Sequence, residues 1–275
     1  MEQREYDVYL VTTPIGNLKD ISLRALEVLK TVDLIYCEDT THSRILLKNY
    51  EIDKKTLSLH KFNTSEVLPK LIENVKSGKK IAYITDAGVP SISDPGQEIV
   101  KKLIENNITY TLVGCPCALI NALVLSGMDT NCFTFIGFLD ENNKKRLKQV
   151  ESIKYSNSTL IFYSAVHNLK EDIKYLYIKL RDRKIAIIRE ITKLYEEIIH
   201  TSLKEFESVE LKGEFVIVVE GFKSDENLDP ENELGILLNL GYDAKDAIKQ
   251  VAKQCNLPKN DVYQMYLKIN KNKGK

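Results

Sequence analysis

Short apolar runs alternate with helix-like segments along the first 113 residues, and this alternation constrains the fold more than any other feature of the chain. Strands joined through single helices at this spacing are typical of a parallel sheet, because parallel neighbours need a crossover connection. The sequence therefore predicts a parallel α/β domain. Its expected strands cover residues 6–11, 32–37, 57–59, 81–84 and 109–113, and its expected helices, the first capped by Ser22, cover residues 22–29, 43–49, 66–76 and 97–105.

The loop after the strand at residues 81–84 holds more turn-forming residues than a simple connection needs. It begins at Asp86, and the next ten residues include two Gly, two Pro, two Ser and a second acid, Asp94. An ordinary strand-to-helix turn needs only about two to six residues. Since open α/β sheets bind ligands at the carboxyl ends of their strands, we expect a ligand site at this loop.

Two further loops, at residues 12–17 and 114–118, also combine Pro and Gly at expected strand ends. None of the three loops carries the G-x-G-x-x-G or G-x-x-x-x-G-K-[ST] pattern, and the pair Gly78-Lys79 lacks the upstream glycine of a phosphate-binding loop. The loops therefore indicate a nucleoside-like ligand without phosphate. S-adenosylmethionine is such a ligand.

The second half of the chain predicts a different kind of sheet. Its strands are not regularly interleaved with helices, which favours a mixed sheet, and we place the domain limits at residues 1–118 and 119–222. The expected strands are residues 133–137, 159–163, 185–189, 196–201 and 215–220, and the expected helices are residues 119–125, 144–153 and 169–180.

A polar linker at residues 222–230 precedes three segments with helical periodicity, at 233–240, 244–254 and 259–269. The tight joint at Leu257-Pro258 suggests a helix-turn-helix-like unit, which we assign to a third domain at residues 232–275. An RNA-binding unit and a small helical cap without a nucleic-acid role both fit this pattern.

Composition is ordinary for a soluble globular protein, with 43% hydrophobic and 28% charged residues. We expect a cytoplasmic protein, because no run of about eighteen apolar residues and no signal peptide is present. The five cysteines form no C-x-x-C pair, so neither a disulfide framework nor a metal site is expected. The balance of 39 basic and 39 acidic residues weighs against nucleic-acid binding, although basic clusters occur near Lys144 and in the tail at Lys268, Lys271, Lys273 and Lys275.

Several motifs together resemble the tetrapyrrole methylase superfamily, and within it the ribosomal small-subunit RNA (cytidine-2′-O) methyltransferases. They span nearly the whole chain and read Thr-Pro-Ile-Gly-Asn-Leu at 13–18, Ser-Leu-Arg-Ala-Leu at 22–26, Glu-Asp-Thr at 38–40, Asp-Ala-Gly-Val-Pro at 86–90, Ile-Ser-Asp-Pro-Gly at 92–96, Arg-Glu-Ile-Thr-Lys at 189–193 and Gly-Glu at 213–214. The resemblance implies a bilobal fold with S-adenosylmethionine in the cleft between the lobes, followed by the small helical domain.

The resemblance also implies an activity: 2′-O-methylation of a cytidine ribose in the decoding region of 16S ribosomal RNA. The substrate is then 16S RNA or the small ribosomal subunit, and the enzyme is expected to be a homodimer. By position, the donor is bound by Pro14, Ile15, Gly16, Asp86, Ala87, Gly88, Val89, Cys117, Ala118, Phe162 and Tyr163.

Ribose methylation needs in-line alignment with the donor methyl group and removal of the hydroxyl proton. We expect Glu190, Lys193 and Asp39 in the catalytic group, with Glu38 and His60 as further candidate bases. An ion pair between domains is an equally good interpretation of the Arg189-Glu190 segment. The residues expected to contact RNA are Arg44, Arg189, Lys144, Lys145 and Arg146.

Two segments depart from the family pattern. The Pro-Gly-Pro-Ser-Ala turn is Gly-Cys-Pro-Cys-Ala at 114–118, where Cys117 replaces a hydroxyl with a weaker hydrogen-bonding thiol. The second segment loses a carboxylate at Ser164 and a cation at Asn168. Two alternative functions therefore stay open: methylation of a tetrapyrrole or other small acceptor, and RNA binding without catalysis.

Overall fold

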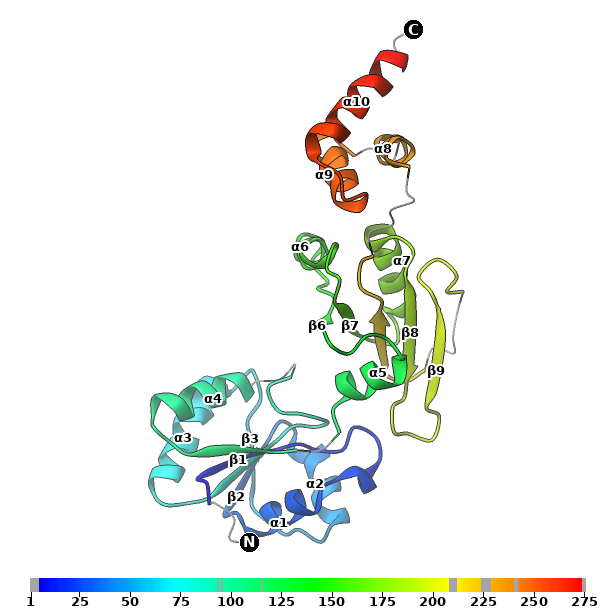
Figure 1. Ribbon diagram of the computed structural model, residues 1–275. Coiled ribbons are helices and arrows are strands. Elements are labelled where there is room, and N and C mark those ends of the chain that lie inside the picture. Colours follow the sequence, from blue (N-terminus) through cyan, green and yellow to red (C-terminus); the bar gives the residue numbers. More distant parts are fainter. Residues whose placement is uncertain are drawn as a thin grey trace.

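The computed structural model describes residues 5–92, 94, 96–114, 116–207, 212–223, 229–239 and 242–273. These residues form two α/β lobes and a helical unit that follow one another along the molecule, with the N-terminus in the first lobe and the C-terminus at the far end of the helical unit (Figure 1). The predicted α/β fold is confirmed. The domain limits at residues 118, 222 and 232 stay predictions. Some residues of the predicted linker, tail and loops lie outside the described residues: 224–228, Lys275, Ser93, Pro95 and Cys115.

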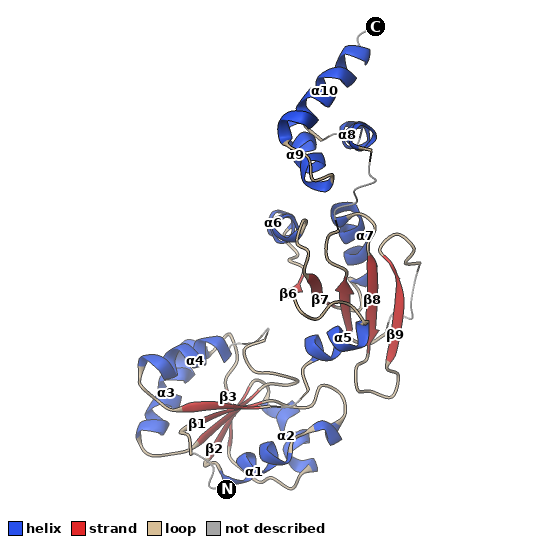
Figure 2. Cartoon of the chain, viewed as in Figure 1, coloured by secondary structure: helices blue, strands red, loops and turns tan. Residues whose placement is uncertain are grey.

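The first lobe is a five-stranded parallel sheet with helices on both faces. Its strands are β1 (Val8–Val11), β2 (Leu34–Cys37), β3 (Thr56–Ser58), β4 (Ile81–Ile84) and β5 (Tyr110–Val113), in the order β3-β2-β4-β1-β5. Helices α1 (Leu23–Thr31) and α2 (Thr40–Asn49) pack on one face, and α3 (Thr64–Lys76) and α4 (Gly96–Glu105) on the other (Figure 2). A short 3-10 helix, Leu18–Asp20, precedes α1. Because β4, β1 and β5 are neighbours, their three Pro- and Gly-containing loops meet at one edge.

Local sequence signals set the helix boundaries in this lobe. The Ser22 hydroxyl accepts the backbone N–H of Ala25 and caps α1 as predicted. Helix α2 begins at Thr40, three residues before the predicted start at Ser43, because the Asp39 carboxylate accepts the N–H groups of Thr41 and His42. A capping role for Asp39 was not part of the sequence prediction.

The second lobe is a mixed sheet, as predicted. Its strands are β6 (Phe133–Phe138), β7 (Thr159–Ser164), β8 (Lys184–Arg189), β9 (Glu197–Ser202) and β10 (Phe215–Val219), in the order β6-β7-β10-β8-β9. Only the β6–β7 pair is parallel among these described strands. Helix α5 (Ala118–Ser126) packs on one face of the sheet, and α6 (Asn143–Ile153) and α7 (Leu169–Leu180) pack on the other.

The helical unit has its own apolar core. Helices α8 (Pro230–Asn239), α9 (Ala244–Gln254) and α10 (Lys259–Lys273) bury Leu234, Val251 and Val262 between them. Polar contacts join this unit to the second lobe: the buried Lys154 ammonium donates to Gln250 Oε1 at 2.8 Å, and Arg181 pairs with Glu233. Among the helices described, none has the length and apolar character that a membrane span requires.

Candidate functional site

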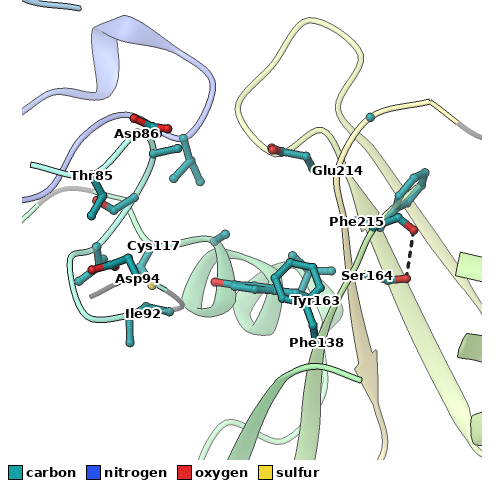
Figure 3. A pocket seen from close by; sticks show the side chains of 18 of the residues that line it. Thr85, Asp86, Ile92, Asp94, Cys117, Phe138, Tyr163, Ser164, Glu214 and Phe215 are labelled. Atoms are coloured by element: carbon teal, nitrogen blue, oxygen red, sulfur yellow. Dashed lines mark hydrogen bonds between the residues drawn. The ribbon is translucent and has the colours of Figure 1, made fainter. Parts of the chain in front are cut away.

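A cavity of about 640 Å³ lies between the two lobes, which is a usual size for a small-molecule site. In Figure 3, Thr85, Asp86 and Asp94 lie on the first-lobe side, and Tyr163, Phe138 and Glu214 lie opposite them. The cavity is therefore formed by strand ends from both sheets. Its lining residues are Ile15, Glu38, 85–89, Ile92, Asp94, Cys117, Ala118, Phe138, 163–166 and 213–216.

Backbone hydrogen bonds join the loops after β1 and β4 into one wall. Thr13 and Gly88 exchange two of these bonds, at 3.0 and 3.1 Å, and the Thr13 hydroxyl donates to the Thr85 carbonyl. Gly88 has a φ of +81°, and a Cβ there would lie 3.3 Å from Ile15 Cγ2. This position therefore favours glycine for both its backbone conformation and its close packing.

Asp94 organises the second turn of the β4–α4 loop. Its Oδ1 atom accepts the backbone N–H groups of Ser91 at 3.0 Å and Gly96 at 2.7 Å. Burial raises the pKa of Asp94 although these hydrogen bonds act in the opposite direction. The carboxylate thus holds the loop against the cavity and contributes negative charge to its lining.

The charged side chains of the cavity are acidic. Glu38, Asp86, Asp94 and Glu214 line it, and no Lys, Arg or His is found among the lining residues that the structure describes. Burial and the nearby charges of Asp86 and Asp94 raise the pKa of Glu38. Such a lining disfavours phosphates and favours a ligand that carries positive charge.

An aromatic group forms the second-lobe wall. The Tyr163 ring contacts Phe135 and Phe138 edge-on, with ring centroids 4.9 and 5.5 Å apart. Burial raises the pKa of Tyr163 to about 12, so its phenol stays neutral at physiological pH. Together with Ile92 from the first lobe, the rings of Tyr163 and Phe138 offer an apolar surface to the planar part of a ligand.

Most residues expected to bind the donor line this cavity: Ile15, Asp86, Ala87, Gly88, Val89, Cys117, Ala118 and Tyr163. Three do not. Pro14 is buried, Gly16 packs against Lys193, and Phe162 is 1% exposed in the core beneath α6 and α7. Phe162 points away from Tyr163 because successive strand residues face opposite sides of a sheet. Donor binding by the lining residues stays a prediction.

Several lining residues were not among those expected from the sequence to bind the donor. Thr85, Ile92 and Asp94 lie in or beside the motif at 86–96, so their position in that loop was the available signal. The second-lobe residues had a weaker signal, because Phe215 and Val216 reach the cavity only through antiparallel pairing of β10 with β7. The remaining unassigned residues are Phe138, Ser164, Ala165, Val166, Gly213 and Glu214, with Glu38 considered only as a base.

Glu190 and Lys193 form an ion-pair cluster with Glu214 beside the cavity. Lys193 Nζ lies 2.8 Å from Glu190 Oε1 and 3.1 Å from Glu214 Oε2, and the Glu214 N–H donates to Glu190 Oε1 at 2.9 Å. Burial alone would raise the pKa of Glu190, but the bonds from Lys193 and Glu214 outweigh it and lower that pKa. Burial alone would lower the pKa of Lys193, and its two carboxylate partners raise it instead. Both groups therefore stay charged, which favours the ion-pair interpretation over proton acceptance.

Close packing against two glycines places this cluster at the junction of the lobes. A Cβ at Gly213, where φ is +100°, would lie 2.5 Å from the Glu190 carboxyl group. A Cβ at Gly16 in the first lobe would lie 2.4 Å from Lys193 Cγ in the second. Both positions therefore need glycine for the cluster to fit.

The residues expected to contact RNA divide into exposed and buried groups. Arg44, Lys144 and Lys145 are exposed. Arg146 is buried, where it pairs with Asp172 at 2.9 Å and Glu171 at 3.0 Å and lies over the Tyr175 ring. Arg189 is also buried, and it donates to the Lys212 carbonyl and pairs with Glu197. The structure thus favours structural roles for Arg146 and Arg189, as it does for Asp39.

Ser164, one of the departures from the family pattern, joins the Arg146 network. Its hydroxyl donates to Asp172 Oδ2 at 2.7 Å, while Ser164 itself lines the cavity. Burial raises the pKa of Asp172 despite the hydrogen bond and the Arg146 charge. The carboxyl group that residue 164 lacks is therefore replaced by that of Asp172 on α7, which lies next to Ser164 at the cavity wall.

Residues 7–207 match the family model described as Tetrapyrrole (Corrin/Porphyrin) Methylases. The chain belongs to this family. It is therefore a methyltransferase.

Its curated relatives match along almost the full length of the chain. "Ribosomal RNA small subunit methyltransferase I" of Bacillus subtilis (strain 168) is 40% identical over 273 residues, covering 94% of this chain and 93% of the relative. The protein of that name from Halalkalibacterium halodurans is 38% identical over 271 residues and covers 94% of each chain. These matches cover more of the chain than residues 7–207, which the family model matches.

Solved structures show the fold alone. Diphthine synthase aligns with a TM-score of 0.65 at 15% identity, covering 78% of this chain and 90% of that one. Uroporphyrin-III-C-methyltransferase from Thermus thermophilus aligns with a TM-score of 0.57 at 16% identity, covering 78% and 93%.

Proposed function

We propose that this protein transfers the methyl group of S-adenosylmethionine to the ribose 2′-oxygen of a cytidine in the decoding region of 16S ribosomal RNA. The observation that carries the proposal is the cavity between the lobes, whose charged lining residues are acidic and whose second-lobe wall includes the aromatic rings of Phe138 and Tyr163. The names of the curated relatives support ribosomal RNA as the acceptor. The proposal includes a cytoplasmic location, because its substrate is ribosomal.

The residues that line the cavity fit S-adenosylmethionine. This molecule carries positive charge on its sulfonium and ammonium groups, which the carboxylates of Glu38, Asp86 and Asp94 would stabilise. Its adenine ring suits the apolar wall at Tyr163 and Ile92. When bound, S-adenosylmethionine supplies a methyl group on a positively charged sulfur.

Glu38 is the candidate base that the geometry supports best. The attacking 2′-hydroxyl loses its proton as the O–CH₃ bond forms, so a proton acceptor must reach it from the cavity wall. Of Glu38, Asp39, His60, Glu190 and Lys193, all described, only Glu38 lines the cavity. We therefore assign proton acceptance to Glu38, and to Glu190 and Lys193 the positioning of Glu214 at the junction of the lobes.

Exposed cations occur on both lobes and on the helical unit. Arg44 lies on α2, which follows the strand that ends beside Glu38, and Lys144 and Lys145 begin α6 after the strand that ends at Phe138. On α9, Lys245 and Lys249 are four residues apart and share an exposed helix face. These side chains support RNA binding despite the zero net charge, since a local basic face is sufficient.

The proposed enzyme is a homodimer. Exposed apolar side chains occur on α5, at Ile120 and Val124, and on the connection between β8 and β9, at Leu194 and Tyr195. Helix α5 also contacts β9, so these groups lie on one side of the second lobe. Sedimentation velocity at micromolar concentration should give a dimer, and a monomer would contradict this part of the proposal.

Mapping 2′-O-methylated cytidines in 16S RNA from a strain lacking the gene tests the proposed reaction. The 2′-O-methyl group of one cytidine in the decoding region should be absent in this strain. It should return when the wild-type gene is restored. Purified protein should then methylate small subunits or 16S RNA from that strain with labelled S-adenosylmethionine. An unchanged methylation pattern would overturn the proposal, and methylation of a tetrapyrrole instead of RNA would favour the alternative acceptor.

A further inference from the structure

Phe62 is an exposed aromatic ring held at the carboxyl edge of the first sheet. Its side chain is 85% exposed, although a phenylalanine in a turn gains nothing from contact with water. The residues around it are polar, from His60 and Lys61 to Asn63 and Ser65. A single ring among polar residues differs from the grouped apolar side chains that mark most protein interfaces.

A dense set of hydrogen bonds keeps this turn in one shape. Asn63 Oδ1 accepts the His60 N–H at 2.8 Å, and Asn63 Nδ2 donates to the Ser58 carbonyl at 3.2 Å. The Thr64 hydroxyl donates to the His60 carbonyl at 2.8 Å, and the Phe62 N–H donates to His60 Nδ1 at 3.3 Å. The ring is thus presented by an ordered turn, so little conformational entropy is lost when a partner stacks on it.

The turn lies next to the proposed catalytic carboxylate. Strand β3 pairs with β2, and beyond the pair the Leu59 N–H donates to the Cys37 carbonyl at 2.8 Å. The Ser58 hydroxyl donates to the Glu38 carbonyl at 3.4 Å. The His60 side chain lies close to the Glu38 carboxyl group. Phe62 therefore lies two residues beyond a group that interacts with the cavity wall.

Positive charge accompanies the ring. Lys61 Nζ lies 5.1 Å from the centre of the Phe62 ring, and the His60 ring contacts it edge-on at 6.1 Å. His42 and Arg44 are exposed on the first turns of α2, which contacts β3. An aromatic face beside cations is the arrangement that binds single-stranded nucleic acid, with a base on the ring and phosphates on the cations.

We propose that Phe62 stacks on an unpaired base next to the nucleotide that enters the cavity, and that Lys61 contacts the adjoining phosphate. This inference rests on the proposed function and adds a substrate-positioning residue to it. Stacking would hold the strand in one position while the 2′-hydroxyl of the neighbouring nucleotide is aligned with Glu38 and the donor methyl group.

The test compares Phe62→Ala and Phe62→Trp with the wild-type protein and with Phe133→Ala. Phe133 is a 39% exposed aromatic residue at the start of β6, at the opposite end of that strand from the cavity residue Phe138. The probe is a single-stranded RNA with 2-aminopurine beside a cytidine, whose fluorescence falls when the base stacks. Small subunits from the strain lacking the gene serve for steady-state kinetics, and calorimetry measures S-adenosylmethionine binding.

Phe62→Ala should abolish the fluorescence quenching and weaken RNA binding about five- to hundredfold, the range for loss of one stacked base. The KM for small subunits should rise more than kcat falls, donor affinity and unfolding midpoint should be unchanged, and Phe62→Trp should restore binding. Phe133→Ala should behave as wild type.

Wild-type RNA affinity in Phe62→Ala would overturn the inference. A Phe62→Ala variant that still quenches the fluorescence but no longer forms a dimer would also overturn it, because the ring would then belong to a protein interface. Failure of the wild-type protein to methylate 16S RNA would instead contradict the proposed function.

Discussion

Asp86 lies where buried strand β4 ends and the cavity begins. Its Oδ1 atom accepts the Asp39 N–H at 3.2 Å, and it is one of the carboxylates that line the cavity. If this group binds the donor, Asp86→Ala should weaken S-adenosylmethionine binding about ten- to hundredfold, because a charged hydrogen bond contributes about 1.5–3 kcal/mol. Calorimetry measures the affinity, and urea unfolding should show that the fold is intact.

Asp86→Asn is the matched control for this substitution. It keeps an oxygen that can accept the Asp39 N–H and removes only the charge, so its donor affinity should lie between those of the wild type and Asp86→Ala. Equal affinity in all three proteins would mean that Asp86 only shapes the loop.

Glu38 should give the reaction a characteristic pH dependence. Burial and the charges of Asp86 and Asp94 raise its pKa, so the carboxylate takes up a proton at a higher pH than an exposed glutamate does. Because a base acts only when deprotonated, kcat should fall as the pH decreases through this raised pKa. Glu38→Gln should lower kcat about a hundredfold or more and remove this acidic limb.

The control for Glu38 is Glu98→Gln, an exposed carboxylate on α4 that is not part of the cavity lining. It should keep the wild-type pH profile. An acidic limb that persists in Glu38→Gln would assign the titrating group to another residue.

At the scale of elements, helix α6 carries both exposed and buried cationic side chains. Lys144 and Lys145 are exposed in its first turn, whereas the Arg146 guanidinium is buried between Asp172 and the Tyr175 ring. Arg146→Ala would leave the Asp172 carboxyl group buried without its cation. This should lower the free energy of unfolding by about 3–5 kcal/mol, as removal of one partner from a buried ion pair does.

Urea unfolding of Arg146→Ala against Lys148→Ala checks this prediction, since Lys148 is exposed on the same helix. Lys148→Ala should be close to wild type in stability. Weakened RNA binding by Arg146→Ala without loss of stability would contradict the structural role and restore Arg146 as an RNA contact.

At the scale of the whole molecule, the two lobes are in close contact at Gly16. An added methyl group there would overlap Lys193 Cγ at 2.4 Å, so Gly16→Ala should push the lobes apart at the edge of the cavity. We expect a loss of about 1–3 kcal/mol in stability, the usual cost of overpacking, together with weaker donor binding. Thermal unfolding and calorimetry measure the two effects.

Gly114→Ala is the matched control, because it also changes a glycine after a strand of the first sheet. A Cβ at Gly114 would meet no atom within 4 Å, and its φ is not in the left-handed region. It should leave both quantities unchanged. Equal behaviour of the two variants would show that contact at Gly16 does not couple the lobes.

Prediction from sequence worked where the signal is local. Residues 81–84 form β4, and the helices expected at 169–180 and 244–254 are α7 and α9. These boundaries depend on apolar periodicity and on neighbouring turn and capping residues. The cavity loops could be identified for the same reason, because Gly and Pro mark the strand ends that meet at one edge of a parallel sheet.

Prediction was weaker where burial depends on distant partners. Arg146 lies in a polar stretch and Arg189 ends an apolar strand, and only their pairing with Asp172 and Glu197 in the folded protein shows that both are buried. Phe62 is the opposite case, an apolar residue that is exposed to solvent because it lies in a turn stabilised by Asn63.

The sequence by itself determined the order of strands and helices, the absence of a phosphate-binding loop and the position of Asp86 at a strand end. Tertiary structure alone decided that Glu38, Asp86 and Asp94 share one cavity, that β10 supplies its far wall, and that Lys193 joins the second lobe to Gly16. The physical reason is the range of the interactions. Periodicity and capping act within a few residues, whereas burial, charge pairing and cavity shape arise from segments brought together by packing.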